Sequence, residues 1–166
     1  FNISHQYEMA VKNSLINMNI LNQCVENNVN RLISIGSSCC YPINASQPFT
    51  EDSYKPGAYE PTNSNYALSK IIMSEAMESL AMKTGYNYKT IIMSNLFGHH
   101  PKKIQTKHHH LIKAVSDKCK MAINRGTTNI IIGGSGKPRR ELIYSDDLAD
   151  ACIYFLKKKT KHTLIN

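Results

Sequence analysis

The sequence has no long hydrophobic run. No segment of its 166 residues approaches the roughly 18 consecutive apolar residues that span a bilayer. Its first residues also lack the charged, apolar and small-residue series of a signal peptide. An odd cysteine count with two adjacent members argues against a secretory disulfide framework; the cysteines are Cys24, Cys39, Cys40, Cys119 and Cys152. We therefore expect a soluble, cytoplasmic protein without a membrane partner.

The sequence also lacks the turn of type GxxGxxG that seats the pyrophosphate of a dinucleotide at a helix N-terminus. The chain begins with Phe1 and ends in an apolar run, Thr163 to Ile165, that is typical of a strand start. We therefore expect a fragment that is incomplete at both ends. Its length and its 42% hydrophobic content are sufficient for one compact domain with a core.

The formal net charge of +8 is compatible with two classes of partner. A basic surface attracts nucleic acid, and it also attracts a small substrate that carries phosphates. Four lysines between Lys157 and Lys161 follow an expected helix, where cations oppose the negative end of the helix dipole. At this point both classes stay open.

Hydrophobic periodicity predicts alternating helices and strands. The expected order is a helix over 7–28, a strand over 31–36, a loop over 37–65, a helix over 65–84, a strand over 88–93, a helix over 110–124, a strand over 129–132, an extended piece over 141–144 and a helix over 146–157. This alternation is typical of a doubly wound parallel α/β sheet, which is Rossmann-like and binds ligands beyond the carboxyl ends of its strands. Ser37, Ser38 and Asn95 lie at such ends.

Two pairs of side chains indicate reductase chemistry. Tyr66 and Lys70 are four residues apart in an expected helix and so share one face. A nearby ammonium favours the tyrosine phenolate, which brings the hydroxyl into range for proton transfer. Ser37 and Ser38 end a buried strand, where hydroxyls can orient a substrate carbonyl. The alternatives are a surface pair on an amphipathic helix and serines that form a turn, but the combination is less common than either part.

Four segments carry a resemblance to a known family: GSSCCYP at 36–42, EPTNSNYALSK at 60–70, SNLFG at 94–98 and GSGKPRRELIYSDDLA at 134–149. Together they resemble the GDP-L-fucose synthase family of extended short-chain dehydrogenases/reductases. The resemblance implies epimerisation of GDP-4-keto-6-deoxy-mannose at C3 and C5, followed by reduction of its C4 ketone with NADP(H). It also implies a GDP-sugar substrate rather than nucleic acid, and a homodimer formed through the first helix and the Tyr66 helix.

The resemblance implies a role for each catalytic residue. Tyr66 is the expected proton donor to the C4 oxygen, Lys70 supports it and binds the nicotinamide ribose, and Ser37 binds the substrate oxygen. Cys39 and a histidine are expected to perform the epimerisations, since a thiolate removes a proton beside a ketone and an imidazole returns one.

The histidine is His110 if the chain has a one-residue insertion, and His109 if it has none. A solvated loop over 108–110 is one alternative. Metal binding together with His99 and His100 ranks third, because no acidic or cysteine partner stands at ligand spacing. We therefore expect no metal site.

The resemblance also implies binding positions. The cofactor positions are Ile35, Gly36, Ser37, Ser38, Tyr66, Lys70, Met93, Ser94, Asn95, Leu96 and His110. Lys118 and Arg140 match positions that hold the nucleotide diphosphate, although each is also compatible with an ordinary surface cation. Gly133 stands where the family carries a tryptophan, so no ring is present there to stack on the substrate. The turn from 133 to 137 suggests a phosphate loop, but Pro138 after Gly-Lys breaks the Walker pattern.

Three hypotheses follow. The favoured one is an incomplete GDP-L-fucose synthase, with residues 1–166 as the central part of one epimerase/reductase domain and 110–166 as the start of its substrate-binding region. The second is a sister epimerase, reductase or dehydratase that acts on another sugar nucleotide. The third is a truncated, non-catalytic remnant that serves as a dimerisation or binding module.

Overall fold

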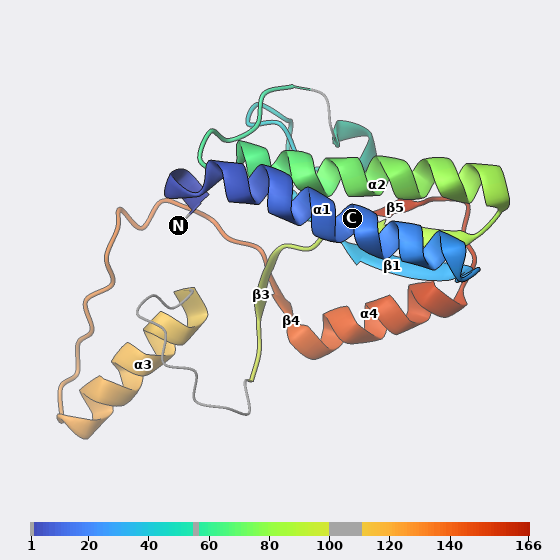
Figure 1. Cartoon of the computed structure of the whole chain (residues 1–166). Helices are drawn as coiled ribbons and strands as arrows, with labels where there is room; N and C mark the ends of the chain where they lie inside the picture. Colours follow the sequence, from blue (N-terminus) through green and yellow to red (C-terminus); the bar gives the residue numbers. More distant parts are fainter. Residues whose placement is uncertain (1, 55–56, 100–110) are drawn as a thin grey trace. The chain divides into compact units, whose positions relative to one another are not determined.

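A computed structural model of the chain describes residues 2–54, 57–99 and 111–166. These residues form two units. The first contains the chain up to Ser94 together with Leu148–Asn166, and the second contains Asn95–Asp147. Each unit is described separately below (Figure 1).

The first unit is built on a three-stranded parallel sheet in the order β1-β2-β5. Its strands are β1 (Arg31–Ile35), β2 (Asn87–Ile91) and β5 (Leu164–Ile165). All five residues of β2 are buried, as befits a central strand covered on both faces. Arg31 aligns with Asn87 and Ile35 with Ile91, so β1 and β2 end at the same edge. The predicted parallel α/β sheet is confirmed.

Two long helices, α1 (Gln6–Glu26) and α2 (Ser64–Thr84), pack side by side on one side of this sheet (Figure 1). Helix α2 ends where Gly85 adopts φ of 72°, and the amide of Gly85 donates to the carbonyl of Ala81. Leu21 from α1, Met73 and Met77 from α2 and Tyr88 from β2 form one buried cluster. No helix in the described part of the chain is long and apolar enough to cross a membrane.

The segment between β1 and α2 packs against the start of α2. It holds the 3-10 turns η2 (Ser38–Cys40) and η3 (Glu51–Ser53), and a further turn, η1 (Asn2–Ser4), precedes α1. Cys40, Tyr41 and Tyr54 are buried with Ala67 of α2 in a second cluster. The Tyr41 ring stacks on Phe49 at a centroid distance of 4.5 Å. The loop predicted over 37–65 is therefore irregular in backbone but has a packed interior.

The second unit contains β3 (Asn95–Phe97), α3 (Leu111–Asn124) and β4 (Leu142–Tyr144), and α4 (Ser145–Lys157) begins in it. Strands β3 and β4 pair in parallel. Strand β3 was not expected from the sequence. The strand expected over 129–132 is wrong, because no described strand pairs with this segment and its apolar side chains face solvent; Ile131 is 86% exposed. The expected helices and the extended piece at 141–144 are confirmed, with ends shifted by one or two residues.

Candidate active site

Gly36 follows the last residue of β1 and packs closely against the neighbouring strand. The amide of Gly36 donates to the carbonyl of Ile91 at 2.8 Å, which continues the β1–β2 ladder by one residue. A Cβ atom on residue 36 would lie 2.3 Å from the Cδ1 atom of Ile92 and 3.1 Å from the Cγ2 atom of Thr90. Glycine therefore fits without displacing the Ile92 side chain, and the next residue, Ser37, lies just beyond the end of the strand.

Ser37 caps the 3-10 turn η2. Its Oγ atom accepts a hydrogen bond of 3.2 Å from the amide of Cys39, and its carbonyl accepts one of 3.0 Å from the amide of Cys40. Ser37 and Cys39 are half-buried, while Ser38 is exposed. The hydroxyl proton of Ser37 is therefore still available to a ligand, because its oxygen is the acceptor in the cap.

Tyr66 and Lys70 lie one turn apart near the start of α2, and the Lys70 Nζ atom is 5.7 Å from the centroid of the Tyr66 ring. The two side chains thus share one face of the helix, as their spacing predicts. Lys70 Nζ also donates a hydrogen bond of 2.9 Å to the carbonyl of Ile35, the last residue of β1. This bond places Tyr66 and Lys70 next to the carboxyl end of β1, which is followed by Ser37.

Burial is the largest cause of the pKa shifts of both Tyr66 and Lys70. The pKa of Tyr66 is raised above 10.0, first by burial and then by the thiols of Cys39 and Cys40. Burial lowers the pKa of Lys70. The net shift of the Tyr66 pKa is therefore upward, because burial and the two thiols outweigh any stabilisation of the phenolate by Lys70, whose ammonium is hydrogen-bonded to a main-chain carbonyl. Tyr66 keeps its proton at neutral pH, which is the form that a proton donor requires.

Cys40 is a neighbour of this site that the sequence analysis missed. It is fully buried, and its Sγ atom lies 3.6 Å from the carbonyl oxygen of Ala67 in the first turn of α2. Burial raises the pKa of its thiol. Behind it, the hydroxyls of Tyr54 and Ser74 are 3.3 Å apart. The adjacency of Cys40 to Cys39 was the available signal, but a buried cysteine that fills a core has no sequence pattern of its own.

The remaining predicted residues of the first unit are Met93 and Ser94, which follow β2 and are half-buried. The structure thus gathers Ser37, Cys39, Tyr66 and Lys70 around the carboxyl end of β1. The roles assigned to these residues stay predictions.

The other predicted positions lie elsewhere in the chain. Asn95, Leu96, Lys118, Gly133 and Arg140 belong to the second unit. There Asn95 donates through its side chain to the carbonyl of Glu141, and Lys118 Nζ donates to the carbonyl of Ile131. Arg140 is exposed, and a Cβ atom on Gly133 would meet nothing within 4 Å.

His110, His109, His108 and His100 lie outside the described residues, and His99 is exposed. Among the residues that the structure describes, no three histidine, cysteine or acidic side chains are grouped as metal ligands.

Comparison with known proteins shows the family to which this chain belongs. The profile of the NAD dependent epimerase/dehydratase family matches residues 1–166. A GDP-L-colitose synthase from Yersinia pseudotuberculosis is 36% identical over 161 residues, which are 96% of this chain and 52% of that protein. A GDP-L-fucose synthase from Escherichia coli strain K12 is 33% identical over 156 residues, 94% of this chain and 48% of that protein.

The chain is also similar in structure to a solved protein of the same type as these relatives. The crystal structure of a GDP-L-fucose synthetase from Naegleria fowleri bound to NADP is similar with a TM-score of 0.82 at 27% identity. The match covers 99% of this chain and 53% of that one. The chain therefore spans about half the length of the proteins that it matches.

Proposed function

The chain belongs to the NAD dependent epimerase/dehydratase family, and we propose that the full-length protein containing it is an NADP-dependent epimerase and reductase of a GDP-4-keto-6-deoxy sugar. The product of this reaction is GDP-L-fucose when the substrate is GDP-4-keto-6-deoxy-D-mannose. One observation carries the proposal: in the half-buried Tyr66–Lys70 pair, Lys70 donates a hydrogen bond to the end of the strand that Ser37 and Cys39 follow. The names of the relatives supply the sugar nucleotide.

In the proposed reduction, the hydroxyl of Ser37 binds the C4 oxygen of the substrate and Tyr66 donates a proton to it. NADPH supplies the hydride that reduces C4. The raised pKa of Tyr66 fits this direction of transfer, because the phenol holds its proton until negative charge develops on the C4 oxygen. Lys70 keeps two of its three N–H donors for the cofactor ribose while the third holds Ile35.

In the proposed epimerisation, Cys39 removes a proton from a carbon next to the C4 ketone. The resulting carbanion is stabilised as an enolate, whose negative charge lies on the oxygen that Ser37 and Tyr66 face. A histidine, His110 or His109, returns a proton to the opposite side of the ring. C3 and C5 both flank the ketone, so the same pair of groups acts twice.

The described residues fit one end of an NADP molecule. The half-buried hydroxyls and ammonium at the end of β1 suit a nicotinamide ribose, and Met93, Ser94, Asn95 and Leu96 are the proposed further contacts. The glycine-rich turn that would hold the pyrophosphate is absent from this sequence. For the substrate, we assign Lys118 and Arg140 to the GDP diphosphate, with Gly133 beside the sugar or base.

The proposed assembly is a homodimer. Both α1 and α2 leave large apolar side chains in solvent, among them Leu15, Ile16 and Ile20 on α1 and Leu68 and Ile72 on α2, each between 44% and 57% exposed. A second copy of the same two helices is the expected cover for this surface. The proposed location is the cytoplasm, since all five cysteines are free.

A sister reaction is the second candidate. The GDP-L-colitose synthase shares slightly more of its sequence with this chain than the GDP-L-fucose synthase does, 36% against 33%. Both names imply a GDP-sugar, but they imply different products. The catalytic residues above do not distinguish the two, because both need a proton donor at a keto oxygen.

The test is incubation of the full-length protein with NADPH and GDP-4-keto-6-deoxy-mannose. We expect oxidation of NADPH and formation of GDP-L-fucose, identified by mass and by nuclear magnetic resonance of the sugar. Oxidation with a different product would support the sister enzyme. If the folded protein binds NADPH but neither oxidises it nor exchanges substrate protons with solvent, the remnant hypothesis is correct and the proposal is wrong.

A further inference from the structure

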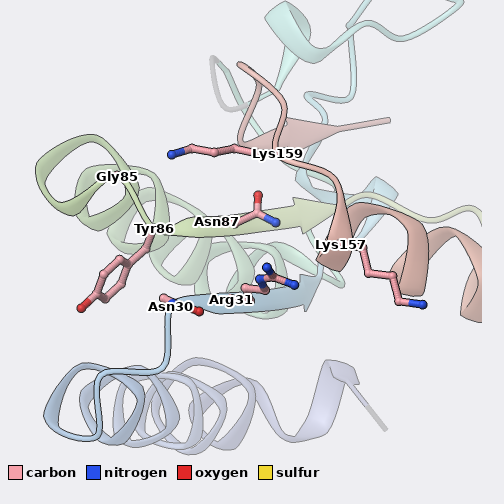
Figure 2. Close-up of a pocket in the computed structure, with 7 residues that line it drawn as sticks. All are labelled: Asn30, Arg31, Gly85, Tyr86, Asn87, Lys157 and Lys159. Carbon is pink, nitrogen blue, oxygen red and sulfur yellow. The ribbon is translucent and has the colours of Figure 1, made fainter.

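A pocket separate from the proposed active site lies at the other end of the strands, where β1 and β2 begin. It is a cavity of about 230 Å³ at the amino ends of β1 and β2. Its wall includes Arg31 at the start of β1, Gly85 and Asn87 around the start of β2, and Lys157 and Lys159 at the end of α4 (Figure 2). A strand rises about 3.3 Å per residue, so the two ends of the five-residue β1 are on the order of 13 Å apart. The pocket is therefore separate from Ser37 and Lys70.

The charge of this pocket has one sign. Arg31, Lys157 and Lys159 contribute three cations, and no acidic residue lines the cavity. In the view of Figure 2, Arg31 lies between the side chains of Lys157 and Lys159, which extend to either side of it. None of the three forms an ion pair with a carboxylate among the described residues. A group of unpaired cations in a concave site favours an anion.

Two carbonyls at the negative end of α4 already accept hydrogen bonds, which weakens their repulsion of an anion. The side-chain amide of Asn87 donates to the carbonyls of Phe155 and Leu156, at 3.1 Å and 3.0 Å. These bonds satisfy two of the carbonyls that carry the negative end of the helix dipole. They also fix the orientation of the amide, so that its Oδ1 atom is buried without a hydrogen-bond partner among the described residues.

A buried lysine holds the segment that carries Lys159. Lys89 on β2 is 2% exposed, and its Nζ atom donates to Thr160 Oγ1 at 2.8 Å and to the carbonyl of His162 at 3.1 Å. The charge of Lys159 lowers the pKa of Lys89, after the larger effect of burial. The hydrogen bonds of Lys89 thus hold the segment next to the pocket, and a bound anion would reduce the repulsion between these cations.

We propose that this pocket binds a small phosphorylated ligand, such as a sugar phosphate or a nucleoside diphosphate, through its phosphate group. The volume supports a small group, because it is below the roughly 300–1,000 Å³ of a site for a drug-sized ligand and equals about eight water volumes of ~30 Å³. Phosphate oxygens match the donors of Arg31, Lys157 and Lys159.

The test uses inorganic pyrophosphate as the probe, with full-length protein at fixed ionic strength. No other nucleotide is added, and the site is identified by the residues whose signals shift, since Gly85 and Asn87 line this pocket and lie at the other end of the strands from Ser37. We expect saturable shifts of the backbone amide signal of Gly85 and the side-chain amide signals of Asn87 in nuclear magnetic resonance spectra. The variant Arg31→Gln/Lys159→Gln should bind pyrophosphate at least about tenfold more weakly, since charged hydrogen bonds to phosphate are lost.

The matched control is Lys12→Gln/Lys120→Gln, which removes the same charge from exposed positions outside the pocket. An equal loss of affinity in this control would show that only the net charge attracts the anion, and would overturn the proposal. Absence of saturable shifts in the wild type would also overturn it. If the double variant does not fold, Lys157→Gln alone provides the measurement, with an expected weakening of several-fold.

Discussion

The ammonium of Lys70 donates a hydrogen bond of 2.9 Å to the carbonyl oxygen of Ile35. The bond joins the second turn of α2 to the last residue of β1, and the two bonded residues are 35 positions apart in the sequence. It also fixes a flexible side chain in a half-buried position before any ligand arrives. A site whose side chains are held by the scaffold loses less entropy when it binds and reacts.

Replacement of Tyr66 with phenylalanine tests the proposed proton donor. The substitution Tyr66→Phe removes one hydroxyl and keeps the ring that packs near Lys70. We expect the rate of NADPH oxidation to fall by roughly 100-fold to 10,000-fold, the usual contribution of a positioned acid, with little change in substrate affinity. Stopped-flow measurement of oxidation and calorimetry of binding separate the two quantities.

The control for this variant is Tyr7→Phe, because Tyr7 is 68% exposed on α1 and lies outside the proposed site. Full reductase activity in Tyr66→Phe would remove the tyrosine from the mechanism. A parallel loss in both variants would indicate a defect in folding or assembly instead.

Cys39→Ser is expected to stop epimerisation while reduction persists. A serine hydroxyl is a far weaker base than a thiolate, but it occupies a similar volume in the half-buried turn. In deuterated water, wild-type protein should place deuterium at C3 and C5, and the variant should place none while it still oxidises NADPH with an already epimerised substrate. Cys119→Ser, at an exposed position on α3, is the matched control. Undiminished exchange in Cys39→Ser would assign the base to another residue.

The helices and the inner strands could be predicted from the sequence because their signals are local. The helix expected over 65–84 is found at Ser64–Thr84, since its apolar spacing and Gly85 are both contained in the segment itself. The shared face of Tyr66 and Lys70 follows from helical spacing for the same reason. Strand β1 could be predicted because a short apolar run ends in glycine and serine.

The remaining features depend on partners that are distant in the sequence. Strand β3 forms because Asn95 aligns with Leu142, a pairing that no local pattern announces. The apolar run at 129–132 looks like a strand but has no described neighbour to pair with. The pKa of Tyr66 is raised by burial, and burial is a property of the whole fold rather than of the Tyr-Lys spacing.

The close packing around Gly36 predicts a steric effect on stability. In Gly36→Ala, the new methyl group would overlap Ile92 Cδ1, which is 2.3 Å from the Cβ position. We expect the free energy of unfolding to fall by about 1–3 kcal/mol, as in other overpacked cores. The double variant Gly36→Ala/Ile92→Val removes the overlapping carbon and should recover part of the loss. Urea denaturation measures each value, and Gly133→Ala, with open space around it, should leave stability unchanged.

A charge introduced among the exposed apolar residues of α1 tests the proposed dimer. Leu15→Glu places a carboxylate at a side chain that is 57% exposed in the single chain. If a second copy covers this surface, the charge is desolvated and the dimer dissociates at concentrations at which the wild type does not. Sedimentation velocity measures the change. Ile123→Glu, at a site on α3 that is 76% exposed, should not alter the mass. A wild-type monomer at all concentrations would contradict the proposed dimer.

The buried phenols behind the site predict a loss of stability in alkali. Burial raises the pKa of Tyr41 from 10.0 to about 12, and it also raises that of Tyr54. The folded chain therefore holds these protons more tightly than the unfolded chain, so the stabilisation is complete below pH 10 and is lost as the pH rises towards 12.

Tyr41→Phe separates this effect from general alkaline unfolding. The Tyr41 hydroxyl is buried without a hydrogen-bond partner among the described residues, so its removal should raise the free energy of unfolding by about 1–3 kcal/mol at neutral pH. The advantage over the wild type should grow further between pH 10 and pH 12, because only the wild type has this phenol to ionise. Urea denaturation at a series of pH values measures both differences. The exposed Tyr7→Phe should show neither, and an advantage of Tyr41→Phe that stays constant with pH would place the Tyr41 pKa at its ordinary value.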